Sequence, residues 1–132
     1  MITFKNGQTS TSALIAADVE CVWSIITDTQ LWPKWGPSVS AVECVDRFIT
    51  AESSGRLQTA LGIWVPFTIT DFEDHHFWSW RIGKIEATGH RVRRHHDNHS
   101  IVSFSMPWWS TPYLIICTKA LGHIKKIAVD SG

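Results

Sequence analysis

Hydrophobic and polar positions change their period twice along the chain. Between residues 39 and 106, short runs of alternating or continuous apolar residues are separated by turn residues, which is typical of β-strands. Together with an earlier run, they predict seven strands at residues 9–16, 39–46, 55–61, 63–72, 77–84, 89–96 and 99–106. Short turns join the last six, and Asp97-Asn98 suits a two-residue type I′ turn. The pattern therefore predicts an antiparallel meander.

Helical spacing precedes and follows this strand-rich region. The first predicted helix has Asp18 as its N-cap and one apolar stripe, formed by Val19, Val22, Trp23 and Ile26. A second short turn is predicted at residues 28–32, with Pro33 and Gly36-Pro37 breaking it. A long helix is predicted to start at Thr111-Pro112. Its apolar stripe consists of Leu114, Cys117, Leu121, Ile124 and Ala128.

This order of elements predicts one α+β domain over residues 1–132: a curved antiparallel sheet of six to seven strands gripping a long C-terminal helix, with two short helices after the first strand. A helix of ~18 residues and a strand of ~8 residues both span about 27 Å, so the helix can cross the concave face. A twisted sheet touches a single rod along only part of its surface. The remaining space must hold large side chains or a cavity.

Composition and charge limit the kinds of partner and the cellular location that we expect. Twelve Lys and Arg balance twelve Asp and Glu, so the chain lacks the positive charge that phosphate backbones attract, and we expect no nucleic-acid partner. No apolar run approaches the ~20 residues of a membrane span. The start, MITFKNGQTS, lacks the apolar stretch of a signal peptide, which predicts a cytoplasmic protein. The three cysteines are scattered singly, without a disulfide or zinc pattern. The sequence does not decide the oligomeric state, and both a monomer and a homodimer are compatible with it.

Several motifs together resemble a known family. They are ADVECVWSIITD at residues 17–28, LWPKWGP at 31–37, SGR at 54–56, FWSWRI at 77–82 and TGHRV at 88–92. In these residues the chain resembles the START/Bet v 1-like (SRPBCC) superfamily with the helix-grip fold, in particular its polyketide cyclase/dehydrase-type branch. The resemblance covers nearly the whole chain and implies a deep, mostly apolar cavity under the C-terminal helix. Members include cyclases, dehydratases and lipid carriers, so the resemblance implies no single catalytic set.

Tryptophan is the most unusual feature of the composition, with 8 among 132 residues. A tryptophan that lines a cavity offers flat apolar area and one N–H donor, which suits planar ligands. Trp23 and Trp32 are interpreted as structural, and Trp108-Trp109 either as a lip at the cavity mouth or as a loop pair or an interface. The expected pocket residues are Trp35, Trp64, Trp78, Trp80, His90, Leu114, Cys117, Leu121 and Ile124. Trp78 and Trp80 share one strand face, which points into the cavity or away from it.

His90 and Arg94 are the candidate catalytic residues. A histidine in a central strand can exchange a proton with a bound carbonyl or hydroxyl, although a hydrogen-bonded structural histidine is the commoner case. Arg94 has the same strand parity and could stabilise negative charge, although most strand arginines face water. About 13 Å separates the two Cα atoms, so the two residues would reach opposite ends of a ligand. His96 and His99 flank a turn without an evident third ligand, so we expect no metal site. No cofactor motif occurs, and no cofactor is expected.

Three functions remain from the sequence. The favoured one is binding of a small hydrophobic or aromatic molecule, polyketide- or lipid-like, between the sheet and the C-terminal helix. The first alternative is a cyclase or dehydratase that acts on a polyketide-like substrate in the same cavity. The second alternative is a non-catalytic protein-interaction module in which the tryptophans fill a collapsed cavity.

Overall fold

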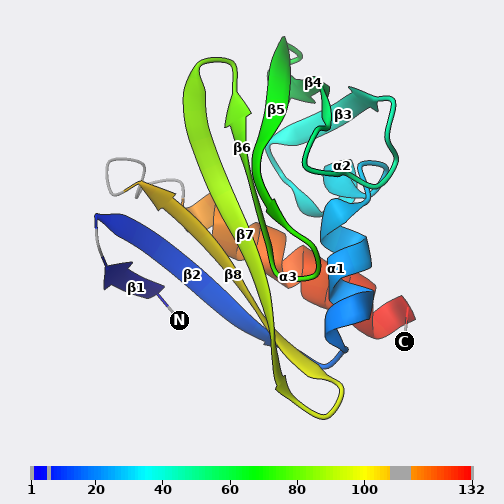
Figure 1. Ribbon diagram of the computed structural model, residues 1–132, viewed down its shortest axis with the longest axis vertical. Helices are drawn as coiled ribbons and strands as arrows, with labels where there is room; N and C mark the ends of the chain where they lie inside the picture. The colour runs from blue at the N-terminus through cyan, green and yellow to red at the C-terminus, as the bar shows by residue number, and fades with distance from the viewer. Residues whose placement is uncertain (1, 6, 108–113, 132) are drawn as a thin grey trace.

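One open antiparallel sheet of eight strands forms the body of the molecule, in the order β1-β2-β8-β7-β6-β5-β4-β3 (Figure 1). The computed structural model describes residues 2–5, 7–107 and 114–131. The strands are β1 (Ile2–Lys5), β2 (Gln8–Ile15), β3 (Val39–Cys44), β4 (Ser54–Thr59), β5 (Trp64–Glu73), β6 (Phe77–Ile82), β7 (Ile85–His96) and β8 (His99–Pro107). The predicted meander is confirmed. The strand count is one higher than predicted because the short edge strand β1 pairs only with β2.

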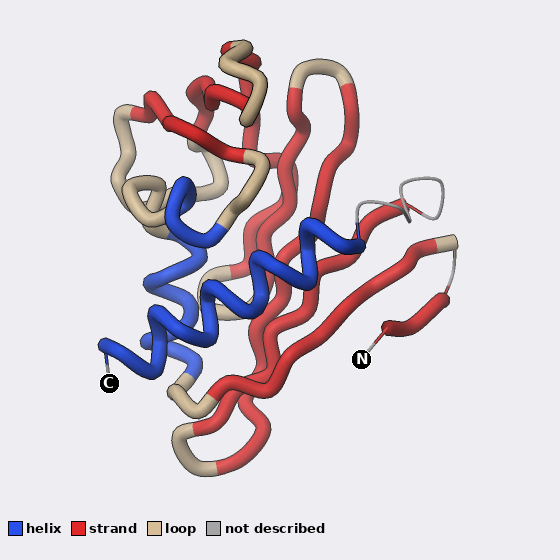
Figure 2. Tube along the Cα trace, turned by 180° about the vertical axis from the view of Figure 1, so that it is seen from behind, coloured by secondary structure: helices blue, strands red, loops and turns tan. Residues whose placement is uncertain are grey.

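The described residues also form three helices: α1 (Val19–Thr27), α2 (Trp32–Trp35) and α3 (Leu114–Ser131). Figure 2 shows α3 lying diagonally across one face of the sheet, with α1 and α2 beside it. We call this the inner face and the opposite one the outer face. None of the helices in the described ranges combines the length and the apolar character that crossing a membrane requires.

The ends of the two short helices follow local chemistry. Asp18 caps α1 as predicted, since its Oδ1 accepts a hydrogen bond of 2.8 Å from the Cys21 N–H. The second helix was predicted at residues 28–32 with Pro33 as its breaker, and this is wrong. Pro33 lies in the first turn of α2, where its missing N–H costs nothing, and Gly36 follows the last helical residue.

The predicted helical stripe of α3 is buried against the sheet and the short helices. Cys117, Leu121, Ile124 and Ala128 are each at most 3% exposed. The side chain of Leu114 lies outside the described part of the structure, as do Trp108-Trp109 and the expected helix start at Thr111-Pro112.

The turn between β7 and β8 differs from the prediction in its geometry. Asp97 and Asn98 join the strands, and His96 pairs with His99. Asn98 has a φ of 55°, whereas Asp97 is not among the described residues with positive φ. A type I′ turn needs positive φ at both central residues, so this turn belongs to another type.

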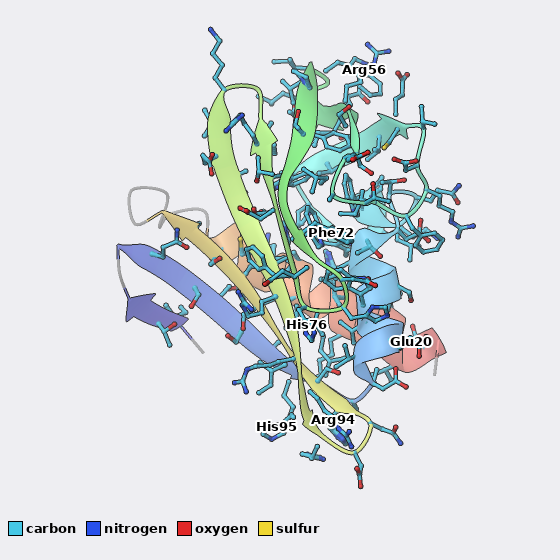
Figure 3. All side chains as sticks on the ribbon, viewed as in Figure 1. Glu20, Arg56, Phe72, His76, Arg94 and His95 are labelled. Carbon is cyan, nitrogen blue, oxygen red and sulfur yellow. The ribbon has the colours of Figure 1, made fainter. Side chains whose placement is uncertain are left out.

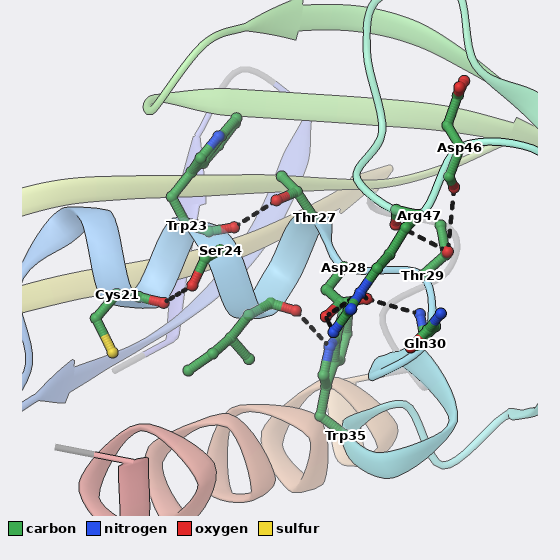
Figure 4. Close-up of polar contacts among 11 residues, drawn as sticks. Cys21, Trp23, Ser24, Thr27, Asp28, Thr29, Gln30, Trp35, Asp46 and Arg47 are labelled. Carbon is green, nitrogen blue, oxygen red and sulfur yellow. Dashed lines mark hydrogen bonds and ion pairs between the residues drawn. The ribbon is translucent and has the colours of Figure 1, made fainter.

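The two tryptophans of α2 satisfy the C-terminal end of α1. The last carbonyls of a helix have no partner within it and need outside donors. Trp32 Nε1 donates to the Ile26 carbonyl at 2.9 Å. Trp35 Nε1 donates to the Ile25 carbonyl at 3.4 Å (Figure 4). The Ile49 N–H donates to the Thr27 carbonyl at 3.1 Å. The two hydrogen bonds that satisfy the last carbonyls of α1 therefore also fix the positions of both indole rings.

A buried carboxylate fixes the corner between α1 and α2. Asp28 is 3% exposed, and its oxygens accept hydrogen bonds from Arg47 Nε at 3.2 Å, Arg47 Nη2 at 3.1 Å and the Gln30 N–H at 3.0 Å (Figure 4). The ion pair raises the pKa of Arg47. It ties the connection between β3 and β4 to the helix corner.

Trp32 and Trp64 provide a matched pair for testing this arrangement. Trp32→Phe removes the hydrogen bond to Ile26 and leaves a gap in a fully buried site, so we expect the free energy of unfolding to fall by about 2–4 kcal/mol. Trp64 is half-buried beneath Arg56. Trp64→Phe should therefore cost about 1 kcal/mol or less. Urea denaturation measures both, and equal losses would contradict this role of Trp32.

Candidate functional site

Two hollows adjoin where β6 and β7 meet the loop after α2. The first, which we call the inner cavity, lies between the sheet and α3 and has a volume of about 40 Å³. The second, which we call the apolar groove, is open to solvent and has a volume of about 420 Å³. The hollows share four lining residues, namely Ser38, Val39, Trp80 and Thr88. The groove and the inner cavity are therefore neighbours, separated by side chains that line both.

The inner cavity is much smaller than the cavity that the family resemblance implies. Its volume of about 40 Å³ has room for a group about the size of water and is far below the roughly 300–1,000 Å³ that is typical of ligand sites. Its walls come from the loop after α2, the sheet and α3, and include Trp35, His90, Phe104 and Cys117. In the part of the chain that the structure describes, the expected deep cavity under α3 is thus largely filled.

A stack of aromatic rings fills that space. Trp78 lies between Trp32 and His90, with ring centroids 5.4 Å from the first and 3.8 Å from the second, and with interplanar angles of 14° and 17°. Trp80 meets all three rings edge-on. All four side chains lie on the inner face and are at most 7% exposed. The stack packs α2 directly against the middle of the sheet.

A chain of hydrogen bonds lies at the His90 end of this stack, and the donor and the acceptor of each bond can be assigned. His90 Nδ1 lies 3.2 Å from the Trp78 carbonyl, which can only accept, so Nδ1 carries the proton. In the neutral ring Nε2 is then an acceptor, and the Thr88 hydroxyl, 3.1 Å away, donates to it. Trp80 Nε1 donates to Thr88 Oγ1 at 3.1 Å. The order is therefore Trp80 to Thr88 to His90 to the Trp78 carbonyl.

Burial keeps His90 uncharged. It lowers the pKa of His90 from 6.5 to about 3, while the hydrogen bond to the Trp78 carbonyl opposes this change. A neutral ring whose Nε2 lone pair already accepts from Thr88 has little capacity to act as a general base near neutral pH. The geometry matches the structural role that the sequence left as the commoner case.

Arg94 does not join His90. It lies far along β7, near the β7–β8 hairpin (Figure 3), where its Nη2 pairs with Asp97 Oδ1 at 3.1 Å and its side chain is 72% exposed. The two residues do lie on the same side of β7, as predicted, but at Arg94 the strand extends beyond the hydrophobic core. The structure brings the two candidate catalytic residues to separate sites.

The predicted pocket residues are distributed over four places. Trp35, Trp80, His90 and Cys117 line the inner cavity, and burial raises the pKa of Cys117 to about 12. Trp78 lies within the stack, while Leu121 and Ile124 are buried further along α3. Trp64 has the opposite strand parity to the buried Phe67, so it lies on the outer face, where the Arg56 guanidinium is 4.5 Å from its ring centroid.

The apolar groove was missed by the sequence prediction. Its lining is mostly aliphatic, with Leu57, Ile82, Ala87 and Met106 beside Trp80. The exposed side chains of Leu61, in the turn between β4 and β5, and of Ile85, at the start of β7, also line it. The prediction treated residues 85–88 as a turn, whereas the turn lies at residues 83–84 and β7 begins at Ile85. Gly83, whose φ is 60°, was the available signal for this tighter turn.

A β-bulge gives the groove its polar end. Ser79 pairs with Gly89 and Arg81 with Glu86, so Trp80 faces two residues, Ala87 and Thr88. Bulges redirect side chains and often occur beside binding sites. Both bulged residues line the groove, and Thr88 alone of the two also lines the inner cavity.

Two larger hollows are less suited to an apolar ligand. One of about 740 Å³ lies beside Glu43 and Arg47, and one of about 560 Å³ lies beside the β7–β8 hairpin with Arg94 and Asp97. Both are open to solvent, as the groove is, but charged side chains contribute to their walls. His96 and His99 have ring centroids 4.2 Å apart, but the described residues contain no group of three or more His, Cys, Asp or Glu side chains placed to hold a metal ion.

The buried neutral histidine predicts a pH dependence of stability. The folded pKa of about 3 is below the ordinary value of 6.5, so the unfolded chain takes up the proton first. Its contribution is complete above pH 6.5 and is lost as the pH falls toward 3. His90→Phe keeps a ring against Trp78 but takes up no proton. Between pH 7 and pH 5 the stability difference between wild type and His90→Phe should shift by about 2 kcal/mol against wild type in urea denaturation. A difference that does not change with pH would contradict a neutral His90.

Solved structures with the same fold share little sequence with this chain. The protein XoxI from Bacillus cereus is 18% identical, with a TM-score of 0.72 over 94% of this chain and 96% of that one. An uncharacterised protein from Bacillus thuringiensis is 18% identical, with a TM-score of 0.71 over 92% and 98%. Protein Ms6760 from Mycobacterium smegmatis is 15% identical, with a TM-score of 0.66 over 100% and 98%. At these identities the similarity shows the fold alone.

The sequence itself carries the family assignment. No curated protein matches the chain. A family model, described as polyketide cyclase / dehydrase and lipid transport, matches residues 7–111, which is most of the chain. The fold around this match, an antiparallel sheet with a C-terminal helix on its inner face, is consistent with the helix grip expected from the sequence. The chain belongs to the polyketide cyclase/dehydrase and lipid transport family.

Proposed function

We propose that the protein binds a small apolar molecule in the apolar groove, with one end of the molecule at Thr88. The observation that carries this proposal is an open hollow of about 420 Å³ with mostly apolar walls and one buried polar group at its inner end. Ligand sites in proteins are typically 300–1,000 Å³ in volume, mostly apolar, and contain a few fixed polar groups. The family, whose description includes lipid transport, supports a hydrophobic ligand.

The groove differs in position from the pocket expected from the sequence. That pocket used α3 as one wall, whereas the lining of the groove comes from β3, β4, β6, β7 and β8, from Ser38 before β3, and from the turn after β4. Because the aromatic stack occupies the space under α3, a ligand in the groove lies at the open end of the sheet. It would touch Trp80 and the aliphatic wall but not Leu121 or Ile124.

Binding is better supported than the cyclase or dehydratase alternative. Such an enzyme needs at least two donors or titratable groups that converge on the substrate. Glu86 is the one charged residue among the groove-lining residues, and its Oε1 is already paired with Arg81 Nη2 at 3.1 Å. His90 is neutral, and its Nε2 is hydrogen-bonded to Thr88. Enzymatic activity therefore remains a prediction without a supporting constellation among the described residues.

The proposal can be tested with N-phenyl-1-naphthylamine, a neutral apolar dye that fluoresces strongly out of water. We expect saturable binding at micromolar concentrations and energy transfer from tryptophan. Ala87→Phe places a ring in the groove and should weaken binding at least about tenfold. Ala51→Phe, in an exposed turn away from the groove, is the matched control and should bind as wild type does.

Two results would contradict the proposal. Absence of saturable binding by folded wild type would exclude a site for apolar molecules of this size. Equal affinity of Ala87→Phe and wild type would place the dye elsewhere, and would move support to the protein-interaction alternative, in which the exposed Leu61 and Ile85 contact a partner.

A further inference from the structure

We propose that the inner end of the apolar groove selects ligands that carry a hydroxyl group, because Thr88 presents a hydrogen-bond acceptor there. This inference rests on the proposed function and names the class of ligand: a neutral apolar molecule with a terminal alcohol or phenol. Its basis is the fixed direction of the hydrogen bonds around Thr88.

The hydrogen-bonding capacity of Thr88 can be counted. A hydroxyl has one proton to donate and two lone pairs to accept with. The proton is used on His90 Nε2, and one lone pair accepts from Trp80 Nε1. One lone pair remains, and Thr88 lines both the groove and the inner cavity. A ligand at this point therefore finds an acceptor, which a ligand hydroxyl satisfies and a ligand carbonyl or ether does not.

The size of the inner cavity agrees with this assignment. Its volume of about 40 Å³ accepts a group about the size of one water molecule, whereas the groove of about 420 Å³ accepts a ring system. The two hollows meet at Thr88 and Trp80. A ligand with its ring in the groove and a single hydroxyl toward the inner cavity would donate a hydrogen bond to Thr88 Oγ1.

Charge disfavours an acid in the same position. Among the residues that the structure describes, neither hollow is lined by a lysine or arginine, and His90 stays neutral because of its burial. The one charged residue of the groove, Glu86, would repel a carboxylate. A buried carboxylate without a counter-charge is strongly unfavourable. An apolar acid should therefore bind less well than an alcohol or phenol of the same shape.

The test compares three naphthalenes that differ only at one position: 2-naphthol, 2-methoxynaphthalene and 2-naphthoate. Each displaces N-phenyl-1-naphthylamine from the wild-type protein. We expect 2-naphthol to bind about fivefold more tightly than the methyl ether, as one net hydrogen bond allows, and 2-naphthoate to bind most weakly. Thr88→Val has the same shape without the hydroxyl and should remove the preference for 2-naphthol. Thr88→Ser should keep it.

The outcomes separate this inference from the proposed function. If the dye binds but 2-naphthol and its ether compete equally, the hydroxyl preference is wrong while the groove remains a binding site. If Thr88→Val keeps the preference, another group supplies the acceptor and the assignment to Thr88 is wrong. If none of the probes binds, the proposed function itself fails.

A second measurement covers the case in which Thr88→Val does not fold. Trp80 Nε1 donates to the same oxygen that would accept from the ligand, so its indole N–H resonance reports directly on that oxygen. In wild type, 2-naphthol should shift this resonance much more than the methyl ether does. Equal shifts from the two compounds would overturn the proposal.

Discussion

The face-to-face stack of Trp32, Trp78 and His90 is the contact on which the arrangement of the other elements depends. It joins the corner between α1 and α2 to the middle of the sheet, and each of its three rings belongs to a residue that also makes a hydrogen bond. Trp32 donates a hydrogen bond to the Ile26 carbonyl at the end of α1. The Trp78 carbonyl accepts a hydrogen bond from His90 Nδ1, and His90 Nε2 accepts one from Thr88. Because these bonds have fixed directions, the stack sets the orientation of α2 and the tautomer of His90 together.

Filling the interior with aromatic rings has a cost and a consequence. Trp78 Nε1 is buried and has no hydrogen-bond partner among the described residues, which opposes folding by about 1–3 kcal/mol. Burial of the large rings and their stacking offset this cost. The consequence is functional: with the space under α3 occupied, the available apolar volume lies at the open end, between the hairpins that end near Leu61 and Ile85.

Periodicity predicted the fold well because its signals are local. Alternation identified seven strands, and helical spacing identified the buried stripe of α3 from Cys117 onward. β1 was missed because four residues are too few to show a period, and α2 was misplaced because Pro33 was interpreted as a breaker rather than a first-turn residue. The position of a residue within a strand, by contrast, does not show where the hydrophobic core ends. Arg94 was therefore paired with His90, although Arg94 lies beyond the buried part of β7.

The site was harder to predict because it depends on register and packing. The bulge opposite Trp80 shifts the face of each following residue, and nothing in the local sequence specifies that shift. Intermolecular nuclear Overhauser effects between bound N-phenyl-1-naphthylamine and protein methyl groups test the central claim most directly. Contacts to Ile82, Ile85 and Ala87, in the groove, are the result that this account predicts. Contacts to Leu121 and Ile124, under α3, would show that the interior opens for the ligand and would contradict it.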